Sequence, residues 1–257
     1  MMIVKLGGSL ITDKSRLRTF RGDRMKVLAQ EIRMAGAEMV LVHGAGSFGH
    51  ILAKEHKLKD GYLNEKQIAG ISQVQRDVKS LNLMVIDALI KEGLKPVSLP
   101  PSSIVRLSDD ALETIDIQPF RKYIDLGLMP VTFGDVVLDM KKRFAICSGD
   151  DLMLWLSREF KPERAAFATD TEGVYQNYPP SEGENIMGKL DWDTFKAIEE
   201  SRTGRADVTG GIIRKLALMF DIADLGVETW VINGGVDGRL MKFLMGHSVP
   251  GTQIMRR

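Results

Sequence analysis

The stretch Val40–Ile51, VLVHGAGSFGHI, decides how the rest of the chain is interpreted. The apolar run Met39–Val42 predicts a buried strand, because so short a run suits a sheet that is covered on both faces. Three glycines then follow within the segment Gly44–Gly49, and the chain continues with helical character. Glycines at a strand-to-helix turn let backbone N–H groups approach an anion, and the helix N-terminus adds its positive dipole end. The stretch therefore predicts a phosphate-binding turn, with the His50 imidazole within reach of the same anion.

The same glycines satisfy the pattern GxGxxG, which by itself is weak evidence for a dinucleotide site. A dinucleotide-binding unit needs a second strand that ends in an acidic residue about 20 residues further on. Here Asp60 lies in the polar stretch Lys54–Lys66, with no apolar run before it. A dinucleotide-dependent oxidoreductase is therefore disfavoured. A structural turn that binds no ligand stays open until the other motifs are considered.

Composition limits the classes of protein to which the chain can belong. Its 257 residues suffice for one large α/β domain or two lobes with a sizeable core. The 35 basic and 34 acidic residues nearly cancel, so neither a nucleic-acid surface nor an acidic tail is indicated. A single cysteine, Cys147, excludes an internal disulfide framework and a cysteine-based zinc site. The chain shows neither a signal peptide nor a long apolar run, so we expect a cytoplasmic protein without a membrane partner.

A second glycine turn lies near the N-terminus, where the short predicted strand Met2–Leu6 runs into Gly7–Ser9. Lys5 lies at the end of this strand, and burying an unpaired ammonium is costly, so we expect Lys5 to have a role in the site. The pattern is not a Walker A motif, in which the lysine follows the glycines. The alternative is that Lys5 extends along apolar surface to reach solvent. The basic segment Leu10–Arg21 is interpreted as a mobile flap from which Lys14 reaches a bound phosphate, or as a solvated loop.

Apolar spacing predicts a series of further helices and strands. Residues Glu65–Glu92 form the longest helical pattern, with one apolar stripe that we expect to pack in the core or against a second copy of the chain. The other predicted helices cover residues 23–35, 117–124, 152–160, 191–200, 211–224 and a segment that leads to Gly251. The other predicted strands cover residues 96–99, 129–133, 136–139, 144–147, 165–168 and 228–232. Repeated strand–turn–helix units favour a doubly wound α/β sheet with its loops at one edge.

Three further motifs follow strand ends in the second half of the chain: SGDD at 148–151, TDTEGVY at 169–175 and DVTGGIIRK at 207–215. Adjacent carboxylates at a helix start are more commonly caps, so those of SGDD matter to the site only if they meet the lysines. Lys215 lies one helical turn after Gly211, on the same face of a predicted helix. Ligands in open α/β sheets gather at the carboxyl ends of the strands. One phosphate site in each half therefore suggests two phosphorylated ligands that meet at the seam, as phosphoryl transfer requires.

Taken in order, the motifs KLGGS, HGAGSFGH, SGDD, TDTEGVY and DVTGGIIRK resemble the amino acid kinase superfamily over essentially the whole chain. His50, together with Lys5 and Lys14, resembles the isopentenyl phosphate kinases in particular. Fosfomycin kinases share much of this pattern, including the histidine, and are the alternative within the superfamily. Glu172 departs from the pattern, because an aspartate is commoner there, but the negative charge is kept.

The resemblance implies an α/β fold, a three-layer sandwich around an open, mostly parallel sheet, formed by residues 1–257 as a single domain. It implies an N-terminal lobe of about residues 1–147 that binds the phosphate acceptor and a C-terminal lobe of about residues 148–257 that binds ATP. The implied reaction transfers the γ-phosphoryl group of ATP to isopentenyl phosphate, with Mg²⁺ shielding the ATP phosphates. We expect a homodimer that binds these two small molecules and no nucleic acid. A noncatalytic nucleotide-sensing module is the alternative from another class, and the presence of both Lys5 and Lys215 argues against it.

The resemblance also assigns roles to individual residues. The catalytic set, in which Asp150 orients Lys5, consists of Lys5, Lys14, His50, Asp150 and Lys215. The acceptor is assigned to Ala45, Gly46, Gly49, His50 and Gly149. The ATP is assigned to Lys5, Gly7, Gly8, Ser9, Asp170, Tyr175, Gly211 and Lys215. No protein ligand for a metal is assigned, and no carboxylate base is needed, because the acceptor phosphate is already ionised. The implied acceptor has a short branched tail, so we expect one or more of Val74, Val78 and Ile86 to face it.

Overall fold

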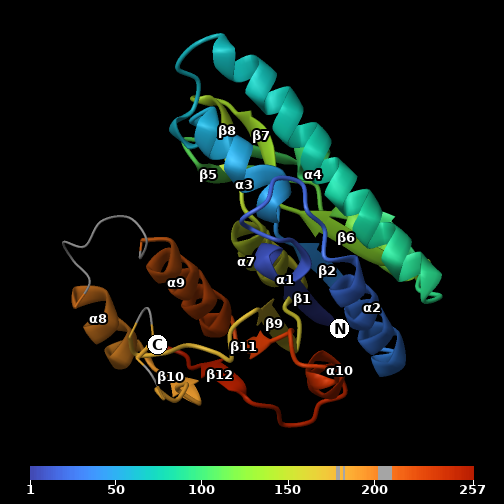
Figure 1. Cartoon of the computed structure of the whole chain (residues 1–257), viewed down its shortest axis with the longest axis vertical. Coiled ribbons are helices and arrows are strands. Elements are labelled where there is room, and N and C mark those ends of the chain that lie inside the picture. Colours follow the sequence, from blue (N-terminus) through green and yellow to red (C-terminus); the bar gives the residue numbers. More distant parts are fainter. Residues whose placement is uncertain (178–179, 182, 202–209) are drawn as a thin grey trace.

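The computed structural model describes residues 1–177, 180–181, 183–201 and 210–257 of the chain. Its largest sheet has eight strands: β1 (Met2–Leu6), β2 (Met39–His43), β3 (Pro96–Ser98), β6 (Met129–Phe133), β9 (Arg164–Thr169), β10 (Lys189–Leu190), β11 (Glu228–Asn233) and β12 (Gly251–Ile254). Their order across the sheet is β10-β12-β11-β9-β1-β2-β6-β3. Every neighbouring pair is parallel except β11 and β12. Because β1 pairs with β2 on one side and with β9 on the other, the two halves of the chain share one sheet (Figure 1).

Helices cover both faces of this sheet. One face carries α6 (Gln118–Asp125), α7 (Gly149–Phe160) and α9 (Gly210–Asp224), and the other carries α2 (Gly22–Ala35), α4 (Lys66–Lys91) and α10 (Arg239–Leu244). Neighbouring residues of one strand serve different cores, since Val40 and Val42 pack with the first set of helices and Leu41 packs with the second. This alternation is what a strand buried on both faces requires. The predicted three-layer α/β sandwich around a mostly parallel sheet is confirmed.

A second, four-stranded sheet lies toward one end of the molecule, beside the N-terminal half of α4 (Figure 1). Its order is β5-β4-β7-β8, and its strands are β4 (Val105–Ser108), β5 (Ala111–Ile115), β7 (Asp135–Asp139) and β8 (Arg143–Cys147). The β7–β8 hairpin agrees with the predicted strands 136–139 and 144–147. β4 and β5 are absent from the sequence-based prediction, because β5 is exposed or half-exposed along its length and shows no apolar alternation. α5 (Pro101–Ile104) leads into this sheet.

Two predicted segments differ from the structure near the chain ends. The expected flap Leu10–Arg21 begins with buried residues, because Leu10 and Ile11 belong to the short helix α1 (Gly8–Ile11) and pack in the core. Thr12 then forms a β-bridge with Phe20, so the loop proper is limited to the residues between them. The helix expected to lead to Gly251 ends early, since α10 stops at Leu244 and β12 follows.

The remaining elements are α3 (Gly46–Glu55), the 3₁₀ helix η1 (Leu58–Asp60) and α8 (Trp192–Glu200). After α3 the chain continues into η1 and α4, without the second strand that a dinucleotide-binding unit requires, so that interpretation is wrong. Among the described residues, none of the helices combines the length and the apolar character needed to cross a membrane.

Candidate active site

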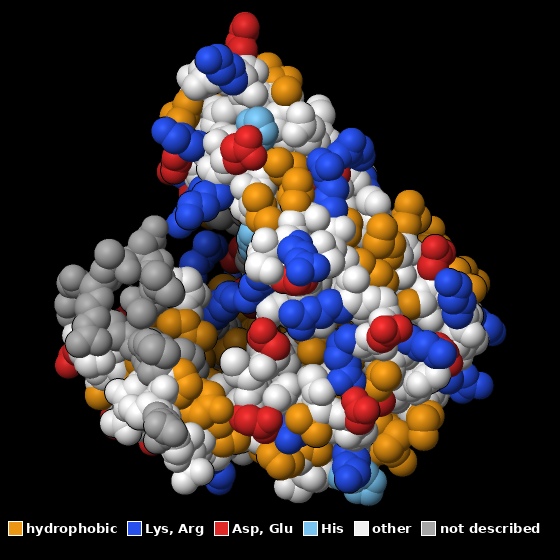
Figure 2. Space-filling view, viewed as in Figure 1, with side chains coloured by type: hydrophobic (Ala, Val, Ile, Leu, Met, Phe, Trp, Pro, Cys, Tyr) orange, Lys and Arg blue, Asp and Glu red, His pale blue; other side chains and the backbone are white. Residues whose placement is uncertain are grey.

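A cavity of about 570 Å³ lies where parallel strands of the large sheet end. The residues that follow β1, β2, β6 and β9 all line it, because the carboxyl ends of parallel strands meet at one edge of a sheet. Figure 2 shows this face hollowed between the two ends of the molecule, with Lys and Arg side chains gathered at the hollow. Most of the residues predicted for the site lie on its walls: Lys5, Gly7, Gly8, Ser9, Lys14, Ala45, Gly49, His50, Gly149, Asp150, Asp170, Gly211 and Lys215.

The two glycine turns pack backbone against backbone at the floor of the cavity. A Cβ atom on Gly8 would lie 2.6 Å from the Gly46 nitrogen, and one on Gly44 would lie 2.6 Å from the Gly8 nitrogen. Real Cβ atoms do not approach backbone so closely, so both positions require glycine. Gly46 has a φ of 49° and is buried at this contact, and it is not among the residues that line the cavity. Its assignment to the acceptor stays a prediction.

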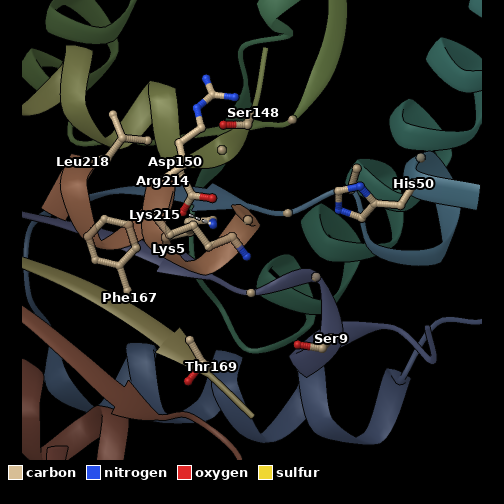
Figure 3. Close-up of a pocket in the computed structure, with 18 of the residues that line it drawn as sticks. Lys5, Ser9, His50, Ser148, Asp150, Phe167, Thr169, Arg214, Lys215 and Leu218 are labelled. Carbon is tan, nitrogen blue, oxygen red and sulfur yellow. Dashed lines mark hydrogen bonds and ion pairs between the residues drawn. The ribbon is translucent and has the colours of Figure 1, made fainter. Parts of the chain in front are cut away.

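Lys5 and Asp150 form a buried ion pair, with Lys5 Nζ donating to Asp150 Oδ1 over 2.5 Å (Figure 3). Lys5 is 9% exposed and Asp150 is 6% exposed, so the alternative in which Lys5 reaches solvent is wrong. Asp150 lies in the first turn of α7, which Ser148 and Asp151 close as a capping box. Burial alone would raise the pKa of Asp150, but Lys5, Lys215 and Arg214 hold that pKa below its ordinary value. Asp150 is therefore an ionised carboxylate that fixes the Lys5 ammonium.

His50, Lys14 and Lys215 lie on the cavity wall with exposed side chains, close enough to influence one another electrostatically. The surrounding protein lowers the pKa of His50 first, and Lys215, Lys14 and Lys5 lower it further. Desolvation likewise lowers the pKa of Lys215, and the neighbouring Lys5 and Lys14 add to this effect while Asp150 opposes it. Both shifts disfavour positive charge, first because the site desolvates the two groups and then because neighbouring lysines repel them. A bound anion would relieve this repulsion.

The wall nearest β9 carries the residues predicted for ATP. Ser9 Oγ donates to Asp170 Oδ1 over 2.7 Å, which joins the first glycine turn to the TDTEGVY motif. Gly149, which is predicted to bind the acceptor, lies beside Lys5, and a Cβ atom there would be 3.1 Å from Lys5 Cε. Tyr175 is half-buried and is not among the described residues that line the cavity, so its assignment to ATP stays a prediction. Asp207, Val208 and Thr209 of the DVTGG motif lie outside the described residues.

The cavity has an apolar end on each side of this charged centre. One end is lined by Ala53, Val74, Val78, Val136 and Ile146, which belong to or pack against a small core cluster between α3, α4 and the second sheet. The other is lined by Val174, Ile212, Leu216, Met219 and Val231, at the edge of the core beneath α9. Val74 and Val78 therefore lie where the sequence predicts. The expectation that one or more of the three residues faces the cavity is met by these two, whereas Ile86 packs against the core between α2, α4 and the large sheet.

Several cavity residues carry chemistry that sequence reasoning missed. Arg214 donates to Asp151 Oδ1 over 3.0 Å and thereby joins α9 to α7, and its position beside Lys215 was the available signal. Lys59 adds a cation to the wall from η1. Asp135 is buried, its Oδ1 accepts from the Val136 nitrogen over 2.8 Å, and burial raises its pKa to about 6. Neither Lys59 nor Asp135 lies in a recognisable motif, so no sequence signal would have found them.

Comparisons with known proteins agree with this geometry. The sequence model of the amino acid kinase family matches residues 1–233. The isopentenyl phosphate kinase of Methanothermobacter thermautotrophicus is 37% identical, over 99% of this chain and 98% of its own. That of Thermoplasma acidophilum is also 37% identical, over 93% of this chain and 94% of its own. A solved structure of isopentenyl phosphate kinase superposes with a TM-score of 0.87 at 34% identity and covers 99% of this chain and 100% of its own. A family match over most of the chain, relatives aligned over nearly their full length and a shared fold lead to one conclusion: the chain belongs to the amino acid kinase family.

Proposed function

We propose that the protein transfers the γ-phosphoryl group of ATP to the phosphate of isopentenyl phosphate, which gives isopentenyl diphosphate and ADP. The observation that carries the proposal is the position of His50. It lies on the cavity wall directly after the glycine turn, among Lys5, Lys14 and Lys215, with the apolar Val74–Val78 wall on the same side. An acceptor with an anionic head and a short apolar tail fits this arrangement. The two relatives that are 37% identical carry the same name.

The charged centre provides what a transfer between two anions needs. ATP and the acceptor repel each other, and catalysis of phosphoryl transfer consists mainly of positioning and charge neutralisation. We assign Lys5 and Lys215 to the transferring phosphoryl group, with Lys14 assisting and Asp150 holding Lys5. His50 donates one ring N–H to the acceptor phosphate. Its lowered pKa favours the neutral imidazole in the free site, and the neutral ring still carries the one N–H that this bond needs. The Ala45, Gly49 and Gly149 backbone lies around the same head group.

The two apolar ends of the cavity support an assignment of its two ligands. The end formed by residues before 148 suits the alkenyl tail, because the residues of this small apolar cluster that line the cavity have aliphatic side chains. The end beneath α9 suits the adenine ring, with Asp170 and Gly211 toward the polar parts of the nucleotide. An N-terminal lobe of about residues 1–147 for the acceptor and a C-terminal lobe of about 148–257 for ATP follow from this assignment.

Mg²⁺, a homodimer and a cytoplasmic location complete the proposal. Mg²⁺ usually keeps several waters and is held by substrate phosphates with one or two carboxylates. The exposed Asp170 carboxylate, beside the Ser9 hydroxyl, is one such group on the cavity wall. A surface for self-association is supported by two exposed apolar residues, Met34 on α2 and Ile90 on α4. Both lie near the C-terminal ends of their helices, which the hydrogen bond from Gln30 to Glu92 joins. The use of ATP and a single free thiol suit the cytoplasm.

A panel of phosphate acceptors tests the proposal. The purified protein is mixed with ATP and Mg²⁺ and with isopentenyl phosphate, fosfomycin, UMP or acetylglutamate, and ADP release is followed with a no-acceptor control. We expect the highest kcat/KM for isopentenyl phosphate and a product that mass spectrometry identifies as isopentenyl diphosphate. A higher value for fosfomycin would contradict the substrate assignment. Acceptor-independent ATP binding without turnover would instead support the noncatalytic module.

A further inference from the structure

A buried polar network lies directly behind the glycine turn that follows β2. His43, the last residue of β2, is fully buried, and its ring stacks on Phe133 with the ring centroids 5.2 Å apart. Its Nε2 lies 3.1 Å from Nδ2 of Asn82 on α4, and its Nδ1 lies 3.1 Å from the carbonyl oxygen of Gly44. Ser98, at the end of β3, donates to Asn82 Oδ1 over 2.5 Å. Three polar side chains from three elements therefore bond to one another, with His43 and Asn82 buried and Ser98 half-buried.

These partners fix one tautomer of the His43 ring. Asn82 accepts from Ser98 with its oxygen, so its amide nitrogen is the atom that faces Nε2 and donates to it. Nε2 is therefore unprotonated, and Nδ1 carries the proton and donates it to the Gly44 carbonyl. Burial lowers the pKa of His43 to about 4, and neither the amide, the carbonyl nor the Phe133 ring that faces the imidazole can ionise. At neutral pH the ring is therefore neutral, and it donates a single hydrogen bond, from Nδ1 to the Gly44 carbonyl.

Gly44 is the residue at which the parts of the site meet. It lines the cavity, and its nitrogen donates to the Leu6 carbonyl at the end of β1 over 2.9 Å. A Cβ atom on Gly44 would lie 2.6 Å from the Gly8 nitrogen, so the two glycine turns cannot move independently. The backbone carbonyl of His43 also accepts from the nitrogen of Gly134, another cavity residue, over 3.2 Å. Rotation of the Gly44 peptide would therefore displace both phosphate-binding turns.

The network also connects this turn to the apolar wall. Asn82 lies four residues after Val78, on the same face of α4, and Val78 lines the tail end of the cavity. We propose that His43, Asn82 and Ser98 are positioning residues that hold the Gly44 peptide, and with it the acceptor phosphate, in register with the wall that receives the acceptor tail. The proposal rests on the proposed function, because only an acceptor that reaches from the glycine turn to α4 uses this register. A displacement of about 1 Å in such a site costs roughly a hundredfold in rate.

Substitutions at His43 separate the donor from the bulk of the ring. His43→Asn keeps an N–H donor near the Nδ1 position and loses the bond to Asn82, whereas His43→Leu loses both. We expect His43→Leu to lower kcat by roughly tenfold to a hundredfold with an unchanged Kd for ATP, and His43→Asn to retain most of the rate. Val85→Ala is the matched control. Val85 is fully buried on α4, the helix that carries Asn82, and it packs in the core away from the cavity. It should lower Tm without lowering kcat.

Asn82→Asp provides a readout that a merely structural role would not move. The carboxylate accepts from Nε2–H, so a neutral His43 ring then turns its Nδ1 lone pair toward the Gly44 carbonyl, and only the protonated ring donates to it. We expect kcat of this variant to rise as the pH falls from 8 to 6, with no matching rise in the parent enzyme. ¹⁵N NMR of histidine-labelled protein reads the tautomer directly, and only four histidines contribute signals. The parent should show Nδ1–H at His43, and Asn82→Asp should show Nε2–H.

Three results would overturn the proposal: an Nε2–H tautomer in the parent, kcat of His43→Leu within twofold of the parent, or an equal loss of kcat in Val85→Ala. If His43→Leu does not fold, the NMR spectrum and the Asn82→Asp profile decide. These results can be told apart from a failure of the proposed function. If the parent prefers another acceptor from the panel, the variants are compared with that acceptor, and the tautomer is read without any acceptor at all.

Discussion

Replacing Lys5 by Met should damage both catalysis and stability, for separable reasons. In the proposed mechanism Lys5 is a preorganised cation at the transferring phosphoryl group, and losing one such group typically lowers kcat by at least about a hundredfold. The same substitution leaves Asp150, which is 6% exposed, without its direct partner. Breaking a buried pair by removing one member costs about 3–5 kcal/mol, and the lower end applies because Lys215 and Arg214 still act on Asp150. A loss of about 3 kcal/mol corresponds to a fall in Tm of roughly 6–12 °C for a chain of this size.

Steady-state kinetics with saturating ATP and isopentenyl phosphate give kcat, and thermal unfolding gives Tm. Lys215→Met is the matched comparison, because Lys215 is exposed and its pKa is already lowered by its surroundings and by neighbouring cations. It should lose a similar factor in kcat and little stability. Lys5→Met combined with Asp150→Asn removes the stranded charge, so Tm should recover while kcat stays low. Wild-type turnover in a folded Lys5→Met protein would refute the catalytic role, and an unchanged Tm would refute the buried pair.

Two further outcomes follow from the apolar wall and from His43. Val78→Ala should let longer prenyl phosphates compete with isopentenyl phosphate, since each buried methylene is worth about 0.8 kcal/mol. Ile86→Ala is the control and should leave the chain-length preference unchanged. An unaltered preference in Val78→Ala would mean that the tail binds elsewhere. The pKa of His43 is about 4 when folded and about 6.5 when unfolded, so the unfolded chain takes up the proton first and stability falls as the pH falls through this window. Urea unfolding at pH 7.5 and pH 4 should show a loss of about 3 kcal/mol that His43→Asn lacks, and equal pH dependence in both proteins would contradict the buried neutral ring.

The large sheet and the position of its loops were predictable because the signal is local. Short apolar runs such as Met39–Val42 are buried on both faces, and each is followed by glycine or by polar residues at the same sheet edge. β5 carries no such signal, because it lies on the outside of a small sheet and is stabilised by pairing with β4 rather than by burial. Its existence depends on a partner that the local sequence does not identify.

The site residues that lie in motifs were predictable from the sequence. Contacts between residues far apart along the chain were not. Lys5 and Asp150 are 145 residues apart, so their pairing followed from the family resemblance and not from spacing. The stripe on α4 identifies inward-facing residues but not what they face. Ile86 lies eight residues after Val78, about 12 Å further along the helix, where α4 has passed the cavity and packs in the core with α2. The bond from His43 to Asn82 likewise joins a strand to a helix that only the tertiary structure brings together.

The central claim is that His50 holds a phosphate acceptor by donating a hydrogen bond, and substitution at His50 tests it most directly. His50→Gln keeps an N–H donor of similar reach, and His50→Ala removes the donor and the ring. The account predicts that kcat/KM for isopentenyl phosphate falls by orders of magnitude in His50→Ala and remains measurable in His50→Gln, with the Kd for ATP unchanged in both. The N-cap of α3 is Ala45, so His50 does not cap its own helix, and if His50 had no role in the site, His50→Ala would leave both turnover and stability nearly unchanged. A stable and fully active His50→Ala enzyme would contradict both the role of His50 and the choice of acceptor.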